Sequence, residues 1–403
     1  MSLDRAPQIC SSFQVAKSDL RRWQWQESAI PAAGALAPGQ VLVAITKFAF
    51  TANNMTYAHL GSPLAYTTIG YWNFFPAPDG WGQIPVWGIG EVVASKHAQL
   101  PVGERFYGFF PMATHLTMTL GDVGGVTVVD VTAHRVGLSP IYNEYRLIER
   151  DPAFDLSRED AYLILRPGFS LSFCCAVYLQ EQNHFGARRI LLTSASSKAA
   201  LGMALLLTEV RQSNLEIVGL TSPDRAKELA ARGIYDHVVG YDEVTTLSTD
   251  VPTGIVDIAN GAALREALDR HLGGCVKHYI IAGFTQRASE ASARPVLRGP
   301  GYELFSTPAH MVERRKQWGD EIFWQRYIEA WRRFQAFTAP WMTIKRTSGC
   351  QGVETIYQEV LDGKTPTETA HILSAWPDKG EGSDGPTSFA ARVPQNGEAR
   401  PGH

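Results

Sequence analysis

The chain has 403 residues, of which 45% are hydrophobic and 19% charged, a composition typical of a globular protein long enough for two domains. Its formal net charge of -3 gives no electrostatic reason to expect nucleic acid or an anionic membrane as a partner. We find no apolar run of the roughly 18 residues that a membrane helix needs, and no apolar core of a secretion signal. Five scattered cysteines without a Cys-x-x-Cys pair exclude a four-cysteine zinc knuckle. We predict a cytoplasmic protein.

The N-terminal part of the chain predicts a β-rich domain. Residues 12–50 and 86–118 contain short runs of alternating apolar and polar side chains, separated by turns at glycine and proline. Between them, residues 51–86 are rich in Tyr, Trp and Phe and show no regular period. Long loops inside a compact domain are usually functional or disordered, and the aromatic content argues against disorder. We therefore expect this stretch to carry function.

From about residue 156 helices and strands alternate. Two helices are predicted at residues 157–166 and 173–185. Five buried strands follow, joined by helices at 197–211, 222–233 and 261–273, and the strands are expected at residues 188–194, 215–221, 235–241, 254–260 and 276–284. This βαβ spacing favours a parallel, doubly wound sheet.

The last part of the chain returns to mixed structure. Residues 308–337 predict one long helix. A strand at 341–346, a helix at 350–364 and a strand at 369–376 follow, and residues 377–403, rich in Pro and Gly, predict a mobile tail. One buried face of the long helix is expected to consist of Met311, Trp318, Ile322, Tyr327 and Trp331.

The order of these elements, with the segments "PGQVLVAITKFAF", "RRILLTSASSKAALG" and "LTSPDRAKELAARGIYDHVVGY", resembles the medium-chain dehydrogenase/reductase superfamily, in particular its zinc-free quinone oxidoreductases. The resemblance covers roughly residues 12–376. It implies an α/β protein with a GroES-like, β-rich catalytic domain at 1–155 and 305–376, which includes a helical insert at 308–338, and a Rossmann domain at 156–304. The phrases "FTANNMTY", "YWNFFP" and "PVWGIGEVVAS" are also similar to a divergent, uncharacterised microbial family within that superfamily.

Zinc-binding members of the superfamily carry a ligand Cys early in the catalytic domain and a Gly-His-Glu further on. This chain has "FAFTANN" and "PVWGIGE" in those regions, with Trp87 at or near the position of the His. The histidines at positions 59, 97, 115 and 134 have no cysteine at a ligand spacing, so we predict no metal site. Without a Lewis acid to hold an alkoxide, the expected hydride acceptor is already polarised, such as an enone or a quinone.

The stretch "LLTSASSKAALG" lies where a dinucleotide-binding domain has its glycine-rich phosphate turn. Related quinone oxidoreductases have Gly or Ala, then Gly and Gly, at the positions of Ser194, Ser197 and Ala200. Serine hydroxyls could replace part of the backbone approach to a pyrophosphate at this helix N-terminus. The alternative is that the serines only cap the helix, in a domain that has lost its cofactor. The expected phosphate-binding residues are Ser194, Ser196, Ser197, Lys198 and Ala199.

The end of the second Rossmann strand has no acid where NAD enzymes bind the ribose hydroxyls. Thr221, Ser222 and Arg225 are found there, and Tyr241 follows the third strand. In the related branch such positions bind the 2′-phosphate of NADP, which a guanidinium beside hydroxyls suits well, although Arg225 alone could be a solvated helix charge. We therefore predict NADP(H) as the cofactor. Two further cofactor-binding residues are expected after the fifth strand, Gly283 and Phe284.

The catalytic residues are expected in the segment 51–57, because it matches the part of the superfamily that faces the substrate and in which relatives place an Asn and a Tyr. Asn53 or Asn54 would hydrogen-bond a substrate carbonyl, and Tyr57 or Tyr71 would supply a proton. The alternative for the aromatic side chains nearby is a role in the core or in dimer contacts. The expected substrate pocket consists of Thr51, Trp72, Phe74 and Phe75.

These expectations describe a zinc-independent, NADPH-dependent oxidoreductase that transfers a hydride to an activated carbonyl compound. Two alternatives remain open: a lyase or isomerase that uses bound NADP(H) without net redox change, and a cofactor-free scaffold or ligand sensor. The expected partner besides a small-molecule substrate is a second copy of the chain, with the strand at 276–284 at the subunit boundary, as in the related dimers.

Overall fold

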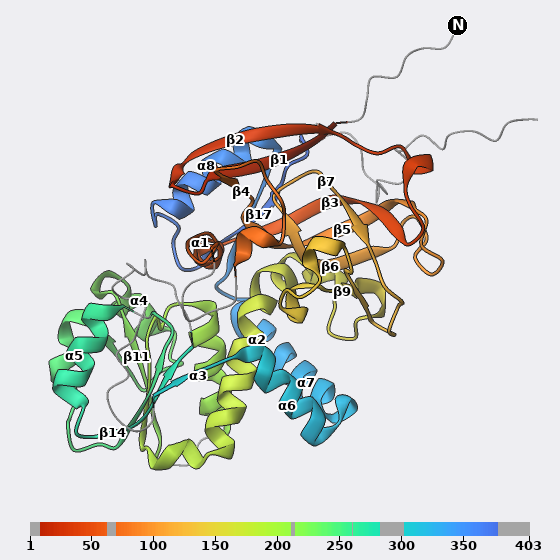
Figure 1. Ribbon diagram of the computed structural model, residues 1–403. Helices are drawn as coiled ribbons and strands as arrows, with labels where there is room; N and C mark the ends of the chain where they lie inside the picture. The colour runs from red at the N-terminus through yellow and green to blue at the C-terminus, as the bar shows by residue number, and fades with distance from the viewer. Residues whose placement is uncertain (1–8, 63–69, 211–213, 260, 283–301, 378–403) are drawn as a thin grey trace, which may run out of the picture. The chain divides into compact units, whose positions relative to one another are not determined.

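The computed structural model describes residues 9–62, 70–210, 214–259, 261–282 and 302–377, and the chain forms two compact units (Figure 1). The first unit contains residues 1–164 and 343–403, and the second contains residues 165–342. The sequence placed the helical stretch 308–338 in the first unit, whereas it belongs to the second. The predicted tail lies outside the described residues, apart from Pro377.

The second unit contains a parallel sheet with the strand order β12-β11-β10-β13-β14-β15, which is the doubly wound order of a Rossmann domain. The five predicted strands are confirmed, and a sixth, β15, was missed because it is only three residues long. Because β14, the strand expected at the subunit boundary, pairs with both β13 and β15, the described sheet ends at β15. The strands are β10 (Arg189–Leu192), β11 (Glu216–Thr221), β12 (His237–Gly240), β13 (Thr253–Asp257), β14 (Val276–Ile281) and β15 (Tyr302–Leu304).

Two helices of the second unit were predicted as a single helix, and one helix was predicted as two. The predicted helix 308–337 is divided at Gly319 (φ 81°) into α6 (Thr307–Trp318) and α7 (Asp320–Thr338). The two helices predicted at 157–166 and 173–185 are one helix, α2 (Glu159–Glu181), with Pro167 inside it. The remaining helices are α3 (Lys198–Val210), α4 (Pro223–Ala231) and α5 (Ala262–Leu272).

The aromatic face of α7 explains why this helix belongs to the second unit. The ring centroid of Phe334 lies 5.4 Å from that of Phe169, and Phe323 lies 5.8 Å from Phe173, so α7 packs against the second-unit part of α2. Ile322, expected on the buried face, is 47% exposed, because the break at Gly319 shifts the helical period to Phe323.

Helix α2 also bears on the question of a membrane segment. Residues 156–181 are long and apolar enough to cross a membrane, contrary to our count of apolar runs, but 67% of the apolar window is buried within the protein. We therefore describe α2 as a core helix.

The first unit is rich in β-strands, as predicted, and its described strands pair antiparallel except for β16 and β17, which are parallel. An eight-stranded sheet has the order β16-β17-β3-β5-β6-β9-β8, with β7 paired to β3, and a three-stranded sheet has the order β2-β1-β4. The strands are β1 (Ile9–Ala16), β2 (Asp19–Ala29), β3 (Gln40–Phe50), β4 (Trp81–Gly82), β5 (Pro85–Ser95), β6 (Arg105–Pro111), β7 (His115–Thr119), β8 (Thr127–Val129), β9 (Glu144–Leu147), β16 (Thr343–Ser348) and β17 (Thr369–Ser374).

The C-terminal segment completes this unit. Figure 1 shows α8 (Gly349–Leu361) and β17, coloured blue, among the red and orange N-terminal strands. Val353 and Tyr357 of α8 are fully buried in the same core cluster as Phe13 and Phe50, which confirms the predicted return of the chain. Residues 51–86, predicted as irregular, contain a helix, α1 (Ala52–His59).

Short 3-10 helices connect the larger elements of both units. They are η1 (Ala33–Ala35), η2 (Tyr71–Asn73), η3 (Ala133–Arg135), η4 (Pro140–Tyr142), η5 (Ile148–Arg150), η6 (Leu156–Arg158), η7 (Asn183–Gly186) and η8 (Tyr241–Thr246).

Candidate functional site

The turn between β10 and α3, residues 194–198, is called the serine turn below. It lies at the carboxyl end of β10, which pairs with β11 on one side and β13 on the other, and this is the point of a doubly wound sheet where ligands bind. Ser194 has a φ of 48°, in the left-handed region that glycine adopts most readily, and its carbonyl accepts the N–H of Ser197 at 2.7 Å. The turn thus keeps a tight, glycine-like backbone without glycine.

The hydroxyl groups predicted to bind a cofactor converge on this turn. The Ser196 and Thr221 hydroxyl oxygens are 3.4 Å apart, and the Tyr241 hydroxyl accepts the N–H of Ser194 at 3.1 Å. Ser197 instead caps α3, because its Oγ accepts the N–H of Ala200 at 3.2 Å, so the capping alternative holds for this residue.

Arg225 is half-buried near the same place. Burial raises the pKa of Tyr241, whereas its hydrogen bonds with Ser194 and the positive charge of Arg225 lower it. Ser222 makes a side-chain hydrogen bond with the carboxylate of Asp224, which lowers the pKa of this exposed acid. The residues that follow β11 therefore include an acid, Asp224, that the sequence analysis did not consider. Gly283 and Phe284 lie outside the described residues.

A buried hydrogen-bond network, which the sequence analysis did not predict, supports the serine turn. The Thr193 hydroxyl donates to Asp257 at 2.7 Å and accepts the N–H groups of Ile258 and Ala259 at 2.8 and 2.9 Å. Gly219 of β11 is needed for close packing, since a Cβ at this position would lie 2.8 Å from the Cβ of Ala195. Backbone and buried hydroxyls thus fix the shape of the turn.

In the first unit, helix α1 presents Tyr57. Thr51 caps the helix by accepting the N–H of Asn53 and donating its own N–H to the Asn54 carboxamide at 2.8 Å. Asn54 is buried and also donates to the carbonyl of Pro85 at 2.9 Å, so its role is structural. The exposed Asn53 reaches the Tyr57 hydroxyl and donates to it at 2.8 Å. Of the two predicted asparagines, Asn53 is the one that contacts the candidate proton donor.

Tyr57 belongs to a group of five aromatic side chains, which we call the tyrosine cluster: Tyr57, Tyr71, Trp87, Phe109 and Tyr142. The Trp87 indole donates to the Tyr57 hydroxyl at 3.0 Å, and the hydroxyls of Tyr71 and Tyr142 lie 2.9 Å apart. The rings of Tyr57 and Tyr71 lie 4.6 Å apart. Burial raises the pKa of both Tyr57 and Tyr71 well above 10, so both phenols keep their protons at neutral pH. The sequence predicted Tyr57 and Tyr71 but missed Tyr142, which follows them by about seventy residues and carries no motif.

Three of the predicted pocket residues are core side chains instead. Phe74 and Phe75 are 1% and 2% exposed. Trp72 packs against Gly61 and Gly82, where an added Cβ would lie 2.0 and 2.5 Å from its ring. The alternative of core contacts is therefore correct for these aromatic residues, while Thr51 is half-buried at the start of α1.

The charged and metal-binding possibilities are limited. Lys47 forms ion pairs with Glu159 and Asp160 at 2.6 and 2.5 Å. Within the described ranges, no group of three or more His, Cys, Asp or Glu side chains is arranged to hold a metal ion.

The chain is similar to one protein family and to solved structures of other proteins. Residues 48–366 match the model of a family described as "Protein of unknown function (DUF2855)". No curated protein matches the sequence. Among solved structures, CurA from Vibrio vulnificus is 12% identical, with a TM-score of 0.54 over 90% of this chain and 98% of that one.

Two further solved structures show the same likeness. CurA from Vibrio vulnificus in complex with NADPH is 14% identical, with a TM-score of 0.53 over 91% of this chain and 98% of that one. A protein from Mesorhizobium loti named as an NADPH:quinone reductase is 13% identical, with a TM-score of 0.55 over 92% of this chain and 99% of that one. The likeness confirms the predicted fold, a GroES-like, β-rich domain with a Rossmann domain.

Proposed function

The chain belongs to the DUF2855 family, and we propose that it is a zinc-independent, NADP(H)-dependent oxidoreductase that reduces an activated carbonyl compound, with Tyr57 as its proton donor. The observation that carries this proposal is the Tyr57 hydroxyl. It accepts hydrogen bonds from Asn53 and Trp87, which serve only as donors in these bonds. Within the described part of the chain no acceptor takes the phenolic proton, so this proton is available to a substrate.

The serine turn supports the cofactor part of the proposal. Its left-handed Ser194, the Ser196 and Thr221 hydroxyls and the half-buried Arg225 form a polar, positively charged end to the central strands. An anion at the N-terminus of α3 is favoured by the helix dipole. CurA, which shares this fold, has been crystallised with NADPH. Ser196, Lys198, Thr221 and Arg225 would hold the phosphates.

The chemistry divides between cofactor and protein. When bound, the reduced nicotinamide supplies a hydride to the substrate. Tyr57 then donates its proton to the enolate that an enone becomes, and the N–H groups of Asn53 and Trp87 stabilise the phenolate that remains. Burial raises the pKa of Tyr57 and makes it a weaker acid than a free phenol, so its proton transfer requires a strongly basic acceptor such as an enolate.

Trp87 supports the zinc-independent part of the proposal. Zinc-binding members of the superfamily have a His at or near this position, whereas here an indole N–H donates to Tyr57. An indole has no lone pair with which to bind a metal ion. The polarisation of the substrate carbonyl therefore falls to hydrogen-bond donors. We also propose a small-molecule substrate and a cytoplasmic homodimer.

Cofactor binding and chemistry can be tested separately. Fluorescence titration with NADPH and NADH should show binding with preference for NADPH, and T221A and R225A should reduce that preference. With 2-cyclohexen-1-one or 1,4-benzoquinone as acceptor, Y57F should lose about 10²–10⁴-fold in kcat and keep its affinity for NADPH. Absence of NADPH binding up to millimolar concentration would refute the cofactor assignment. Conversion of a substrate without net loss of NADPH absorbance would favour the lyase or isomerase alternative.

A further inference from the structure

Tyr142 carries a hydroxyl group that has no role in the proposed function. Its hydroxyl lies 2.9 Å from that of Tyr71, and either oxygen could be the donor. One proton lies between the two oxygens, so the pair has a second proton that must be directed elsewhere. The direction of this second proton decides what the pair can do.

Burial decides between the two directions. Tyr71 is 5% exposed and its hydroxyl has no other hydrogen-bond partner in the described ranges, so a proton directed outward from this hydroxyl would be buried and unsatisfied. Such a group costs about 1–3 kcal/mol. Burial also raises the pKa of the Tyr142 phenol, but as a residue Tyr142 is half-buried and more exposed than Tyr71, so the outward direction costs less for its proton. The favoured arrangement has Tyr71 donating to Tyr142, and Tyr142 directing its own proton outward.

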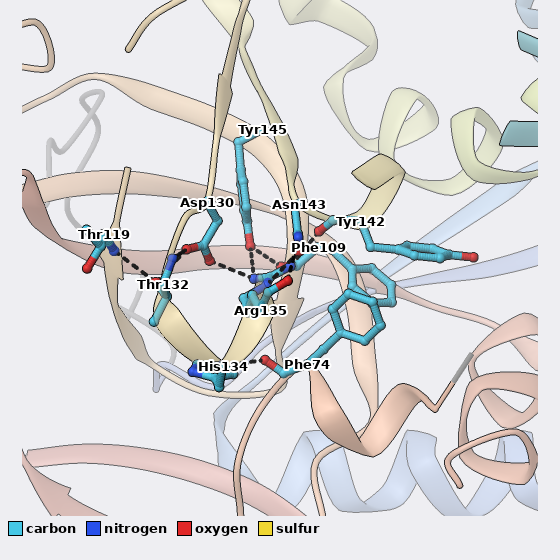
Figure 2. A network of polar contacts seen from close by, with 10 residues as sticks. All are labelled: Phe74, Phe109, Thr119, Asp130, Thr132, His134, Arg135, Tyr142, Asn143 and Tyr145. Atoms are coloured by element: carbon cyan, nitrogen blue, oxygen red, sulfur yellow. Dashed lines mark hydrogen bonds and ion pairs between the residues drawn. The ribbon is translucent and has the colours of Figure 1, made fainter. Parts of the chain in front are cut away.

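Arg135 holds Tyr142 in place. Figure 2 shows the guanidinium of Arg135 among the residues of a buried network, donating to Asp130 at 2.9 Å, to Asn143 at 3.0 Å and to the backbone carbonyl of Tyr142. The Tyr142 side chain points away from this network (Figure 2). Because Arg135 is 1% exposed, the backbone of Tyr142 is fixed from the core side, while its phenol packs among the rings of the tyrosine cluster.

The two phenols lie next to each other. The ring centroids of Tyr57 and Tyr142 are 6.4 Å apart at an angle of 78°. Trp87 is also half-buried, and its ring centroid lies 6.0 Å from that of Tyr142. The half-buried phenol of Tyr142 and indole of Trp87 thus lie beside the phenol of Tyr57, which is buried at 6% exposed.

We propose that Tyr142 is a second catalytic donor, which together with Tyr57 binds the oxygen of a planar, conjugated carbonyl substrate and stabilises the negative charge that develops on it. This inference rests on the proposed function. Two donors directed at one oxygen are the usual means by which enzymes stabilise an oxyanion, and loss of one typically costs about 10²–10³-fold in kcat. Arg135 is then a positioning residue that acts through the backbone of Tyr142.

A binding experiment tests the donor pair without turnover. The probe is 4-nitrophenol, whose phenolate mimics an enolate oxygen and absorbs visible light. Bound to the wild-type protein, it should ionise at a lower pH than in water, because donated hydrogen bonds favour the charged form. Y57F and Y142F should each raise this apparent pKa by about one pH unit, which is a tenfold change in the ionisation ratio.

Control variants separate a donor from a structural residue. Y145F removes a hydroxyl that bonds to Arg135 and to the Phe109 carbonyl in the same network, and it should leave the ionisation of the probe unchanged. R135K should raise the apparent pKa of the probe in part, because the guanidinium that holds the Tyr142 carbonyl is lost. With an enone substrate, Y142F should lower kcat about 10²–10³-fold while KM changes little.

The outcomes distinguish this inference from the proposed function. A probe shift in Y57F but not in Y142F, or a wild-type protein that does not bind the probe, would overturn the role of Tyr142. Shifts in both variants with no NADPH-dependent turnover of any enone would support the donor pair and refute the reductase. An equal effect of Y145F and Y142F would make Tyr142 a structural residue and overturn the inference.

Discussion

The serine turn and the tyrosine cluster differ in how the chain builds them. The turn is a contiguous stretch of five residues with a left-handed Ser194, placed directly after β10 and supported by Asp257 and Gly219 of the neighbouring strands. The cluster brings together side chains from α1, η2, β5, β6 and η4, which are spread over more than eighty residues. Local sequence dictates the first, and long-range packing dictates the second.

The two regions also differ in the interactions that stabilise them. In the turn, single hydrogen bonds between small groups set the geometry, and each is worth about 1 kcal/mol. The cluster rests on a buried ion pair between Arg135 and Asp130, which are 1% and 2% exposed at the side chain. We therefore expect substitutions under the cluster to cost much more than substitutions in the turn.

The largest expected effect is that of R135M. The change removes one partner of a buried ion pair and leaves Asp130 without its countercharge, so unfolding free energy should fall by about 3–5 kcal/mol. Urea denaturation of the variant and the wild type measures this. The double variant R135M/D130N should recover part of the loss, because no uncompensated charge remains buried. A loss below about 1 kcal/mol would show that the network does not support the cluster.

The features with local sequence signals could be predicted, whereas those that depend on long-range packing could not. The Rossmann strands, the turn and the return of the chain at residues 343–374 have local signals, namely buried strands, capping residues and helical periods. Ile322 was assigned to the wrong face because one glycine at position 319 resets the helical period. Trp72 was mistaken for a pocket residue, because nothing in the local sequence pattern shows that Gly61 and Gly82 leave room for its ring. Tyr142 could not be found, since only the fold brings it to Tyr71.

Low pH should destabilise the first unit through His115. Burial lowers the pKa of this residue of β7 to about 4, so the folded protein favours the neutral imidazole. The unfolded chain takes up a proton below about pH 6.5, and stability is therefore lost as the pH falls from 6.5 to 4. The loss is at most about 3 kcal/mol and is reduced by the partial exposure of the ring. Denaturation at pH 7.5, 5.5 and 4.5 should show a smaller pH dependence in H115F, and an equal dependence in both proteins would contradict this assignment.

The packing under the serine turn is tested by G219A. An added methyl group would lie 2.8 Å from the Cβ of Ala195 and 3.1 Å from the ring of Tyr235, so the turn must shift. We expect a loss of about 1–3 kcal/mol in unfolding free energy and weaker NADPH binding. Gly274 has no atom within 4 Å of such a Cβ, so G274A is the matched control and should change neither quantity. Unaltered NADPH binding in G219A would separate the turn from the cofactor.

The smallest effect is expected at Ser194, where two variants distinguish the role of the backbone from the role of the hydroxyl. S194A keeps a Cβ at a φ of 48° and removes the hydroxyl, whereas S194G also removes the strain of the left-handed conformation. S194G should therefore be more stable than S194A by about 1 kcal/mol, as measured by the urea midpoint. If the hydroxyl binds phosphate, both variants should lose NADPH affinity equally. If the backbone N–H groups alone bind it, S194G should match or exceed the wild type, and the serine turn would then act through its backbone as a glycine turn does.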